Sequence, residues 1–395
     1  MINPAQRSVI AEGRGLGHAR LMYFGYFLAL GAYLPFITLY YERLGLSGME
    51  IGTLAAIPLV VSSATALLWG AAADALRRHR LVLGIALLGS PAVVLLIARA
   101  EGYAGLAPLV AVFALFNSPI VPLLDSAALE AAEESGRDYG TLRVWGTIGW
   151  SISTWLVGAL IQDRGTRVMF YAFAGVMALT FVASQLGPTR IRVLRSSLGH
   201  GLRRLLLRAD MLSFLVAIFL LSTTTGAVTA FFSIYLDGLG AGEGMIGLSW
   251  MVSSVSEIPV MAGAAWLRRR IGTRGLLMTG FAVYAFRWLL FSIITDPIWA
   301  LLPQLLHGLS FGAFLVGGVT FMSERAPEGL GTTAQAVFTT VCYGLAAIVG
   351  ALGGGYLYDQ VGMAGLFRVL FAVAAVGLVV LWAALRVPGE AEGDR

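Results

Sequence analysis

Most of this sequence consists of apolar runs about 20 residues long, and these runs limit the fold more than any other feature. A helix of about 20 apolar residues crosses the hydrocarbon core of a bilayer. Only 12% of the residues are charged, against roughly 25% in an ordinary soluble domain. The candidate spans lie near residues 21–42, 50–73, 81–99, 104–126, 141–162, 168–187, 211–236, 245–266, 275–295, 299–323, 333–356 and 365–386. The sequence therefore predicts an all-α integral membrane protein with twelve transmembrane helices.

The distribution of the basic residues predicts the orientation of these spans. All 27 are arginine, and most lie in alternate loops, around residues 7–20, 77–80, 190–208 and 268–274. The other loops hold few: Arg43, Arg99, Arg164 and Arg167. Because arginine is retained on the cytoplasmic side, we expect both termini in the cytoplasm and the chain in the cytoplasmic (inner) membrane. This pattern explains the net charge of +5 without a nucleic-acid partner.

Several kinds of chemistry lack the residues they need. Cys342 is the only cysteine, which excludes an internal disulfide, and a chain without lysine has no Walker A loop. The four histidines form no pattern of metal ligands, and we expect neither a metal nor a cofactor: His18, His79, His200 and His307. The polar first twenty residues precede a full-length span, so we expect them to be retained and not cleaved as a signal peptide.

The two halves of the chain resemble each other. "PFITLYYERLGLSGMEIG" at Pro35–Gly52 aligns without a gap to "AFFSIYLDGLGAGEGMIG" at Ala230–Gly247, an offset of 195 residues. "VGALIQDRG" near Gly158 resembles "GGYLYDQVG" near Gly355 at a similar offset. We therefore predict two six-helix bundles, residues 1–187 and 211–395, joined by a basic amphipathic cytoplasmic linker at 188–210.

Parallel repeats of six helices resemble the major facilitator transporters, whose ligand sites lie between the repeats. "GAAADALRR" after the second span resembles the conformational-switch loop of that superfamily, which implies a switch role for Gly70, Asp74, Arg77 and Arg78. The match is partial, because Leu76 and Arg77 stand where the family has a small residue and a glycine. In the second half, Arg269 stands where the aspartate would be.

The ionisable residues within the predicted spans include Asp125, Arg143, Glu257, Arg287 and His307. Such groups normally face a bundle interior, where they form pairs or line a wet cavity. We expect Asp125 to pair with Arg143, and Glu257 to pair with Arg287 or His307. Each pair could handle substrate or protons, or could be a static ion pair that positions helices.

Five segments resemble, in order and spacing, the lactose-permease branch of sugar–proton symporters and its nucleoside and phenylpropionate relatives. They are "LGAYLPF" at Leu30–Phe36, "DYGTLRVWGTIGW" at Asp138–Trp150, the glutamate at 257, "YAFRWLL" at Tyr284–Leu290 and "PQLLHGLSF" at Pro303–Phe311. The resemblance implies substrate binding by Asp125, Arg143, Trp150, Tyr33, Phe36 and Gln304. It implies proton coupling by Glu257, Arg287 and His307.

The chain also departs from that branch. Ser310 stands where the lactose permease has its proton-releasing glutamate, Gln304 replaces a lysine, and the seventh span has no aspartate. Glu257 is then the leading candidate for a proton carrier, since the charge of a carboxyl group responds to burial and to a nearby arginine. The alternative is that Glu257 is a static partner of Arg287.

The expected function is proton-coupled symport of a small organic solute by a monomer, with a sugar or glycoside preferred over a nucleoside or an aryl acid. A proton-driven drug exporter is an alternative, although "GTIGWSISTWLVGAL" lacks the proline of the motif typical of such exporters. Uncoupled facilitation is another. A membrane enzyme or a receptor is less consistent with the sequence, which shows no nucleophile–base pair and no loop long enough for a soluble domain.

Overall fold

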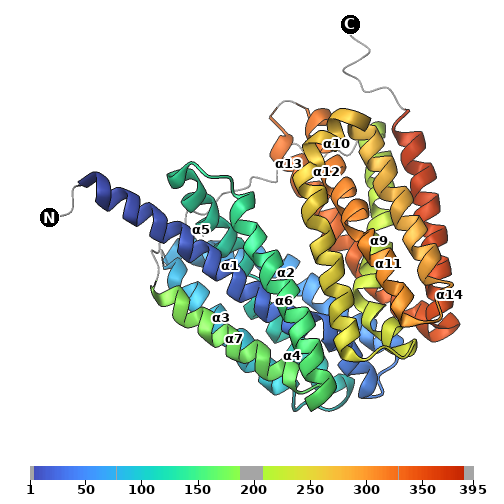
Figure 1. Cartoon of the computed structure of the whole chain (residues 1–395), viewed down its shortest axis with the longest axis horizontal. Coiled ribbons are helices and arrows are strands. Elements are labelled where there is room, and N and C mark those ends of the chain that lie inside the picture. The colour runs from blue at the N-terminus through green and yellow to red at the C-terminus, as the bar shows by residue number, and fades with distance from the viewer. Residues whose placement is uncertain (1–3, 77, 187–207, 328, 387–395) are drawn as a thin grey trace, which may run out of the picture. The chain divides into compact units, whose positions relative to one another are not determined.

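The computed structural model describes residues 4–76, 78–186, 208–327 and 329–386, and all regular secondary structure in these residues is helical (Figure 1). Ten stretches of it are long and apolar enough to cross a membrane, which confirms the all-α membrane fold. The elements are α1 (Pro4–Arg43), α2 (Gly48–Leu76), α3 (His79–Ile97), α4 (Gly102–Asn117), α5 (Ile120–Ser135), α6 (Gly140–Arg164), α7 (Val168–Leu186), α9 (Ala209–Gly238), α10 (Glu243–Phe291), η1 (Pro297–Ala300), α11 (Leu301–Leu305), α12 (His307–Arg325), α13 (Gly331–Thr339), η2 (Thr340–Leu345) and α14 (Ala346–Ala384).

Two of the ten stretches are too long to be single spans. Glu243–Phe291 has 49 residues, and at 1.5 Å per residue a continuous helix of that length would measure about 74 Å, more than twice the hydrocarbon thickness. Gly331–Ala384 has 54 residues. Each is interrupted by a glycine in a left-handed conformation, Gly272 with φ 69° and Gly362 with φ 66°. Glycine adopts this conformation without a steric penalty, so each break joins two helical segments.

Contacts divide the chain into two compact units. The first comprises Met1–Leu46, Ile57–Leu194 and Gly242–Met251, and the second comprises Ser47–Ala56, Arg195–Ala241 and Val252–Arg395. In the first unit, α1 packs against α5, α6 and α7, and α3 lies beside α7. In the second, α9 packs along α14, and α12 contacts α13. The predicted linker at 188–210 falls largely outside the described residues, and the predicted bundle boundaries remain a prediction.

The sequence repeat is reproduced in local geometry. Gly45 and Gly240, which the alignment pairs, follow α1 and α9 with φ of 81° and 87°. The amide of Gly45 donates to the carbonyl of Glu42, and the amide of Gly240 donates to the carbonyl of Asp237, each at 2.8 Å. The aligned segments therefore end their helices in the same way.

Aromatic side chains fill the interior of both units. In the first, the ring of Tyr33 packs against Phe113, Phe170 and Phe173, with centroids 5.3–6.1 Å apart. In the second, Trp288 stacks on Phe291 at 6.1 Å and is 1% exposed. Because these rings exclude water, polar groups placed among them need protein partners.

Candidate substrate and coupling site

The centre of the candidate coupling site is Arg287 on α10, a guanidinium that is only 2% exposed. Its Nε donates to the carbonyl of Pro303 at 2.8 Å, and its Nη2 donates to Oε1 of Gln304 at 2.6 Å. Its Nη1 donates to Oγ of Ser310 at 2.9 Å and lies 3.0 Å from Nδ1 of His307. The buried positive charge is thus compensated by hydrogen bonds, none of which goes directly to a carboxylate.

A break between two helices supplies these acceptors. α11 ends at Leu305 and α12 begins at His307, and the amide of Leu306 donates to the carbonyl of Pro303 at 3.2 Å. That carbonyl lies at the end of the short helix, so it also accepts from Arg287. Spacings of three place Gln304, His307 and Ser310 on one face, toward α10.

Aromatic rings surround the same guanidinium. The Cζ atom of Arg287 lies 5.6 Å from the ring centroid of Tyr284, 5.1 Å from that of Trp288 and 6.0 Å from that of Phe291. Cation–π attraction strengthens when the cation is desolvated. The rings and the hydrogen bonds together hold Arg287 in one position.

The contacts of His307 determine which of its nitrogens carries a proton. A guanidinium has donors only, so Nδ1 must offer its lone pair to Arg287. The other nitrogen, Nε2, then carries the hydrogen and donates to Oε1 of Glu257 at 3.1 Å. Among the described residues, Glu257 therefore reaches Arg287 through a neutral imidazole. This confirms the expected contact of Glu257 with His307 and not a direct one with Arg287.

Close packing of α10 against α12 brings these two side chains together. The amide of Gly308 donates to Oγ of Ser256 at 2.8 Å, and a Cβ atom at Gly308 would lie 1.9 Å from the carbonyl oxygen of Ser256. Glu257 directly follows Ser256 on α10, and His307 directly precedes Gly308 on α12. Only glycine at 308 permits this approach.

In the first unit, Asp125 on α5 accepts two tyrosine hydroxyls. Tyr23 from α1 donates to its Oδ1, and Tyr139 donates to the same atom at 2.9 Å. The two hydroxyls lie 3.1 Å apart. Burial raises the pKa of Tyr139, which keeps its hydroxyl protonated as a donor at neutral pH. One turn along α1 from Tyr23, Tyr26 donates to Oδ1 of Asn117 at 3.2 Å.

The expected ion pair of Asp125 with Arg143 is absent from the part of the chain that the structure describes. Arg143 lies one turn after Tyr139 on α6, and its side chain is exposed. The tyrosines satisfy the carboxylate instead. Trp150, two turns further along α6, is partly exposed, and its ring lies edge-on to that of Trp250 at 6.4 Å.

The remaining candidate residues have different environments. Tyr33 and Phe36 are buried, at 2% and 1% exposure, and the Tyr33 ring contacts the aromatic core of the first unit. Gln304 belongs to the Arg287 network. Of the candidate switch loop, Arg77 and the side chains of Gly70 and Asp74 lie outside the described residues, while Arg78 is exposed directly before α3.

Sequence reasoning missed the tyrosines that contact Asp125. Tyr139 lies inside the quoted segment at Asp138–Trp150, four residues before Arg143, and this helical spacing could have indicated a shared face. Tyr23 and Tyr26 share a face of α1 by their spacing of three. These signals are weak, because tyrosine at such spacing is more often part of a core.

With this geometry in place, comparison with known proteins supplies the family. Residues 18–369 match the MFS_1 like family. The chain belongs to that family. As an MFS_1 like protein it is a multi-pass membrane transporter of the major facilitator type, which confirms the resemblance seen in the sequence.

Individual relatives of this MFS_1 like chain carry different solutes. It is 32% identical to the maltose permease of Geobacillus stearothermophilus over 91% of this chain and 92% of that one. It is 27% identical to a probable 3-phenylpropionic acid transporter of Escherichia coli (strain K12), over 90% and 94% of the two chains. The crystal structure of the nucleoside transporter NupG superimposes with a TM-score of 0.82 at 18% identity, over 94% of this chain and 98% of that one.

Proposed function

We propose that this protein is a proton-coupled symporter that imports a small organic solute, preferably a sugar or glycoside, across the cytoplasmic (inner) membrane. The observation that carries this proposal is the chain of contacts from Glu257 through His307 to Arg287. The sugar preference is supported by the similarity to a maltose permease, the most identical of the relatives described above.

Glu257 is the group that takes up the proton. As long as Arg287 occupies the lone pair of Nδ1, His307 cannot accept a second proton, so an arriving proton goes to the carboxylate of Glu257. Ionised Glu257 balances the charge of Arg287, and protonation leaves one uncompensated positive charge. Because uncompensated charge is costly at membrane depth, protonation biases the protein toward a different set of contacts.

Asp125 and its neighbours form the solute side of the mechanism. A sugar hydroxyl can replace Tyr23 or Tyr139 as a donor to Asp125, since all three are hydroxyl groups. The exposed Arg143 donates to solute oxygens, and the partly exposed indole of Trp150 stacks on the apolar side of the ring. Tyr33 and Phe36 shape this region from the core of the first unit. In the second unit, Gln304, which accepts from Arg287, is the further candidate for a solute contact.

The proposed architecture has twelve spans. The breaks at Gly272 and Gly362, which divide two of the ten long stretches, support this count. We assign six spans to each of two bundles, 1–187 and 211–395, joined by the cytoplasmic linker 188–210. Both termini are cytoplasmic, and the monomer operates by alternating access. Gly70, Asp74, Arg77 and Arg78 form the switch loop.

The proposal is tested by proton movement in lightly buffered vesicles that contain the purified protein. Sugars including maltose, nucleosides and aryl acids are added in turn to wild type, Glu257→Gln and Glu324→Gln. Glu324 is the matched control, an exposed glutamate near the end of α12, in the same unit. We expect a sugar to make the medium outside more alkaline with wild type and Glu324→Gln but not with Glu257→Gln.

Two results contradict the proposal. Solute uptake that is equal in all three proteins and moves no protons would make the chain a facilitator, with Glu257 as a static partner of His307. Acidification of the medium on solute addition would indicate exchange of a proton for the solute, as expected of an exporter.

A further inference from the structure

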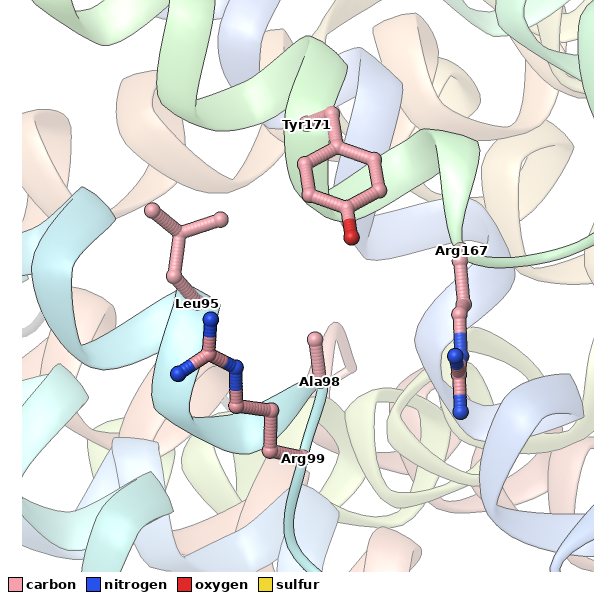
Figure 2. Close-up of a pocket in the computed structure, with 5 residues that line it drawn as sticks. All are labelled: Leu95, Ala98, Arg99, Arg167 and Tyr171. Atoms are coloured by element: carbon pink, nitrogen blue, oxygen red, sulfur yellow. The ribbon is translucent and has the colours of Figure 1, made fainter.

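A pocket of about 350 Å³ lies between α3 and α7 in the first unit (Figure 2). Leu95, Ala98 and Arg99 line it from the end of α3, and Arg167 and Tyr171 line it from the start of α7. Figure 2 shows the hydroxyl of Tyr171 pointing into the space, with the side chains of Arg99 and Arg167 on different sides of it. None of these residues belongs to the candidate solute or coupling groups.

The lining carries an unusual charge. Two of its five residues are arginine and none is acidic. Within the described residues, neither Arg99 nor Arg167 forms an ion pair, and both side chains are exposed. Arginine is also scarce on this side of the protein, where Arg43 is already paired with Glu243 at 2.6 Å. Two unpaired guanidinium groups at one pocket indicate an anionic ligand.

The position of the pocket along the spans indicates where that ligand resides. The span of α3 ends at Ile97 and that of α7 begins at Val168, so Arg99 and Arg167 lie within two residues of the span ends. Leu95 lies inside its span, as does Tyr171, which is 63% exposed. Aromatic rings favour the interface, with the polar tip toward the headgroups. The pocket therefore bridges hydrocarbon and headgroup regions.

We propose that this pocket binds the headgroup of an anionic phospholipid in the leaflet opposite the termini. The phosphodiester lies between Arg99 and Arg167 and accepts the hydroxyl of Tyr171, while an acyl chain follows the apolar surface at Leu95. The pocket volume of about 350 Å³ is that of roughly a dozen water molecules, and this number is similar to the number of heavy atoms in a glycerophosphate headgroup. A free anion would leave the apolar wall of the pocket unused.

Native mass spectrometry of the purified full-length chain, titrated with phosphatidylglycerol or phosphatidylcholine, tests the proposal. The variants are Arg99→Gln/Arg167→Gln, the charge-preserving Arg99→Lys/Arg167→Lys, and Arg164→Gln as control. Arg164 is an exposed arginine at the same end of the spans that does not line the pocket. We expect wild type to prefer phosphatidylglycerol at least about tenfold. The double glutamine variant should lose this preference, while the lysine variant and the control retain most of it.

Equal binding of both lipids to wild type would overturn the proposal, and this comparison requires no variant. Loss of the preference in Arg164→Gln to the same extent as in the double glutamine variant would also overturn it, because the effect would then be diffuse surface charge. A third arm titrates inorganic phosphate. Displacement of the lipid by phosphate at submillimolar concentration would identify a free-anion site and refute lipid as the occupant.

Discussion

Replacing Gly308 by alanine is expected to separate α12 from α10 at the point where the coupling network is built. The added Cβ atom would lie 1.9 Å from the carbonyl oxygen of Ser256 and 2.8 Å from the amide nitrogen of Glu257. Non-bonded contacts are attractive only beyond about 3.5 Å, so the helices must move apart by about 1 Å or more. The bond from the amide of Gly308 to Ser256, 2.8 Å long, and the His307–Glu257 contact, 3.1 Å long, would then exceed hydrogen-bonding distance.

The cost follows from these contacts. Overpacking of a closely packed contact costs about 1–3 kcal/mol, and the two lost hydrogen bonds add about 1–3 kcal/mol, for a total of about 2–6 kcal/mol. Two further glycines provide a graded series. At Gly312 the nearest atom to the new Cβ is Cγ1 of Val260 at 2.8 Å, a side chain that can shift, so a smaller loss is expected. At Gly263 nothing lies within 4 Å, and alanine should be neutral or stabilising by up to about 1 kcal/mol.

The sole cysteine provides the assay. Cys342 is 3% exposed, so a thiol-reactive dye labels it only when the second unit unfolds. With about 2–4 °C per kcal/mol for a unit of this size, Gly308→Ala should lower the midpoint of thermal unfolding by roughly 4–24 °C. Proton movement should be lost as well. The reasoning is refuted if Gly308→Ala melts with wild type, or if Gly263→Ala is destabilised as much as Gly308→Ala.

Three further outcomes are expected. Tyr139→Phe removes one donor to Asp125 and should change sugar affinity about three- to tenfold. Since burial raises the pKa of Tyr139, affinity measured by calorimetry in the Glu257→Gln background, where the proposed proton carrier is removed, should stay constant from pH 7 to 9, and a steep decline there would contradict this. Arg287→Lys keeps the positive charge but loses the planar set of donors. It should destabilise the second unit by about 3 kcal/mol in the dye assay and abolish proton movement. Wild-type behaviour of this variant would exclude a positioning role for Arg287. Asp210 is buried between Arg208 at 2.9 Å and Arg325 at 3.3 Å, and it joins the start of α9 to the end of α12. Asp210→Asn should therefore lower the stability of the second unit by about 3 kcal/mol in the same assay. An unchanged unfolding midpoint would show that these ion pairs contribute nothing to stability.

The candidate site was predictable in part. The intramembrane charges stand out because each is costly in an apolar run, and this pointed to Glu257, Arg287 and His307. Their partners were harder to identify. The predicted bond between Asp125 and Arg143 assumed that a carboxylate pairs with the nearest opposite charge, whereas in the structure neutral tyrosine hydroxyls satisfy it.

The sequence by itself determined the properties that depend on local stretches of chain. Hydropathy over a window of about 20 residues indicates a span whatever the rest of the chain does, and arginine in alternate loops indicates orientation. Paired glycines such as Gly45 and Gly240 marked equivalent helix ends, which the structure reproduces with positive φ at both.

Only the tertiary structure decided which groups touch. Glu257 and His307 are separated by 50 positions, and their contact exists because Gly308 lets α12 approach the backbone of Ser256. The tautomer of His307 follows from the donor that faces it, which no local pattern specifies. Arg99 and Arg167 likewise share a pocket because α3 packs beside α7. Contacts between distant segments depend on packing distances, and a linear pattern of residue types does not contain those distances.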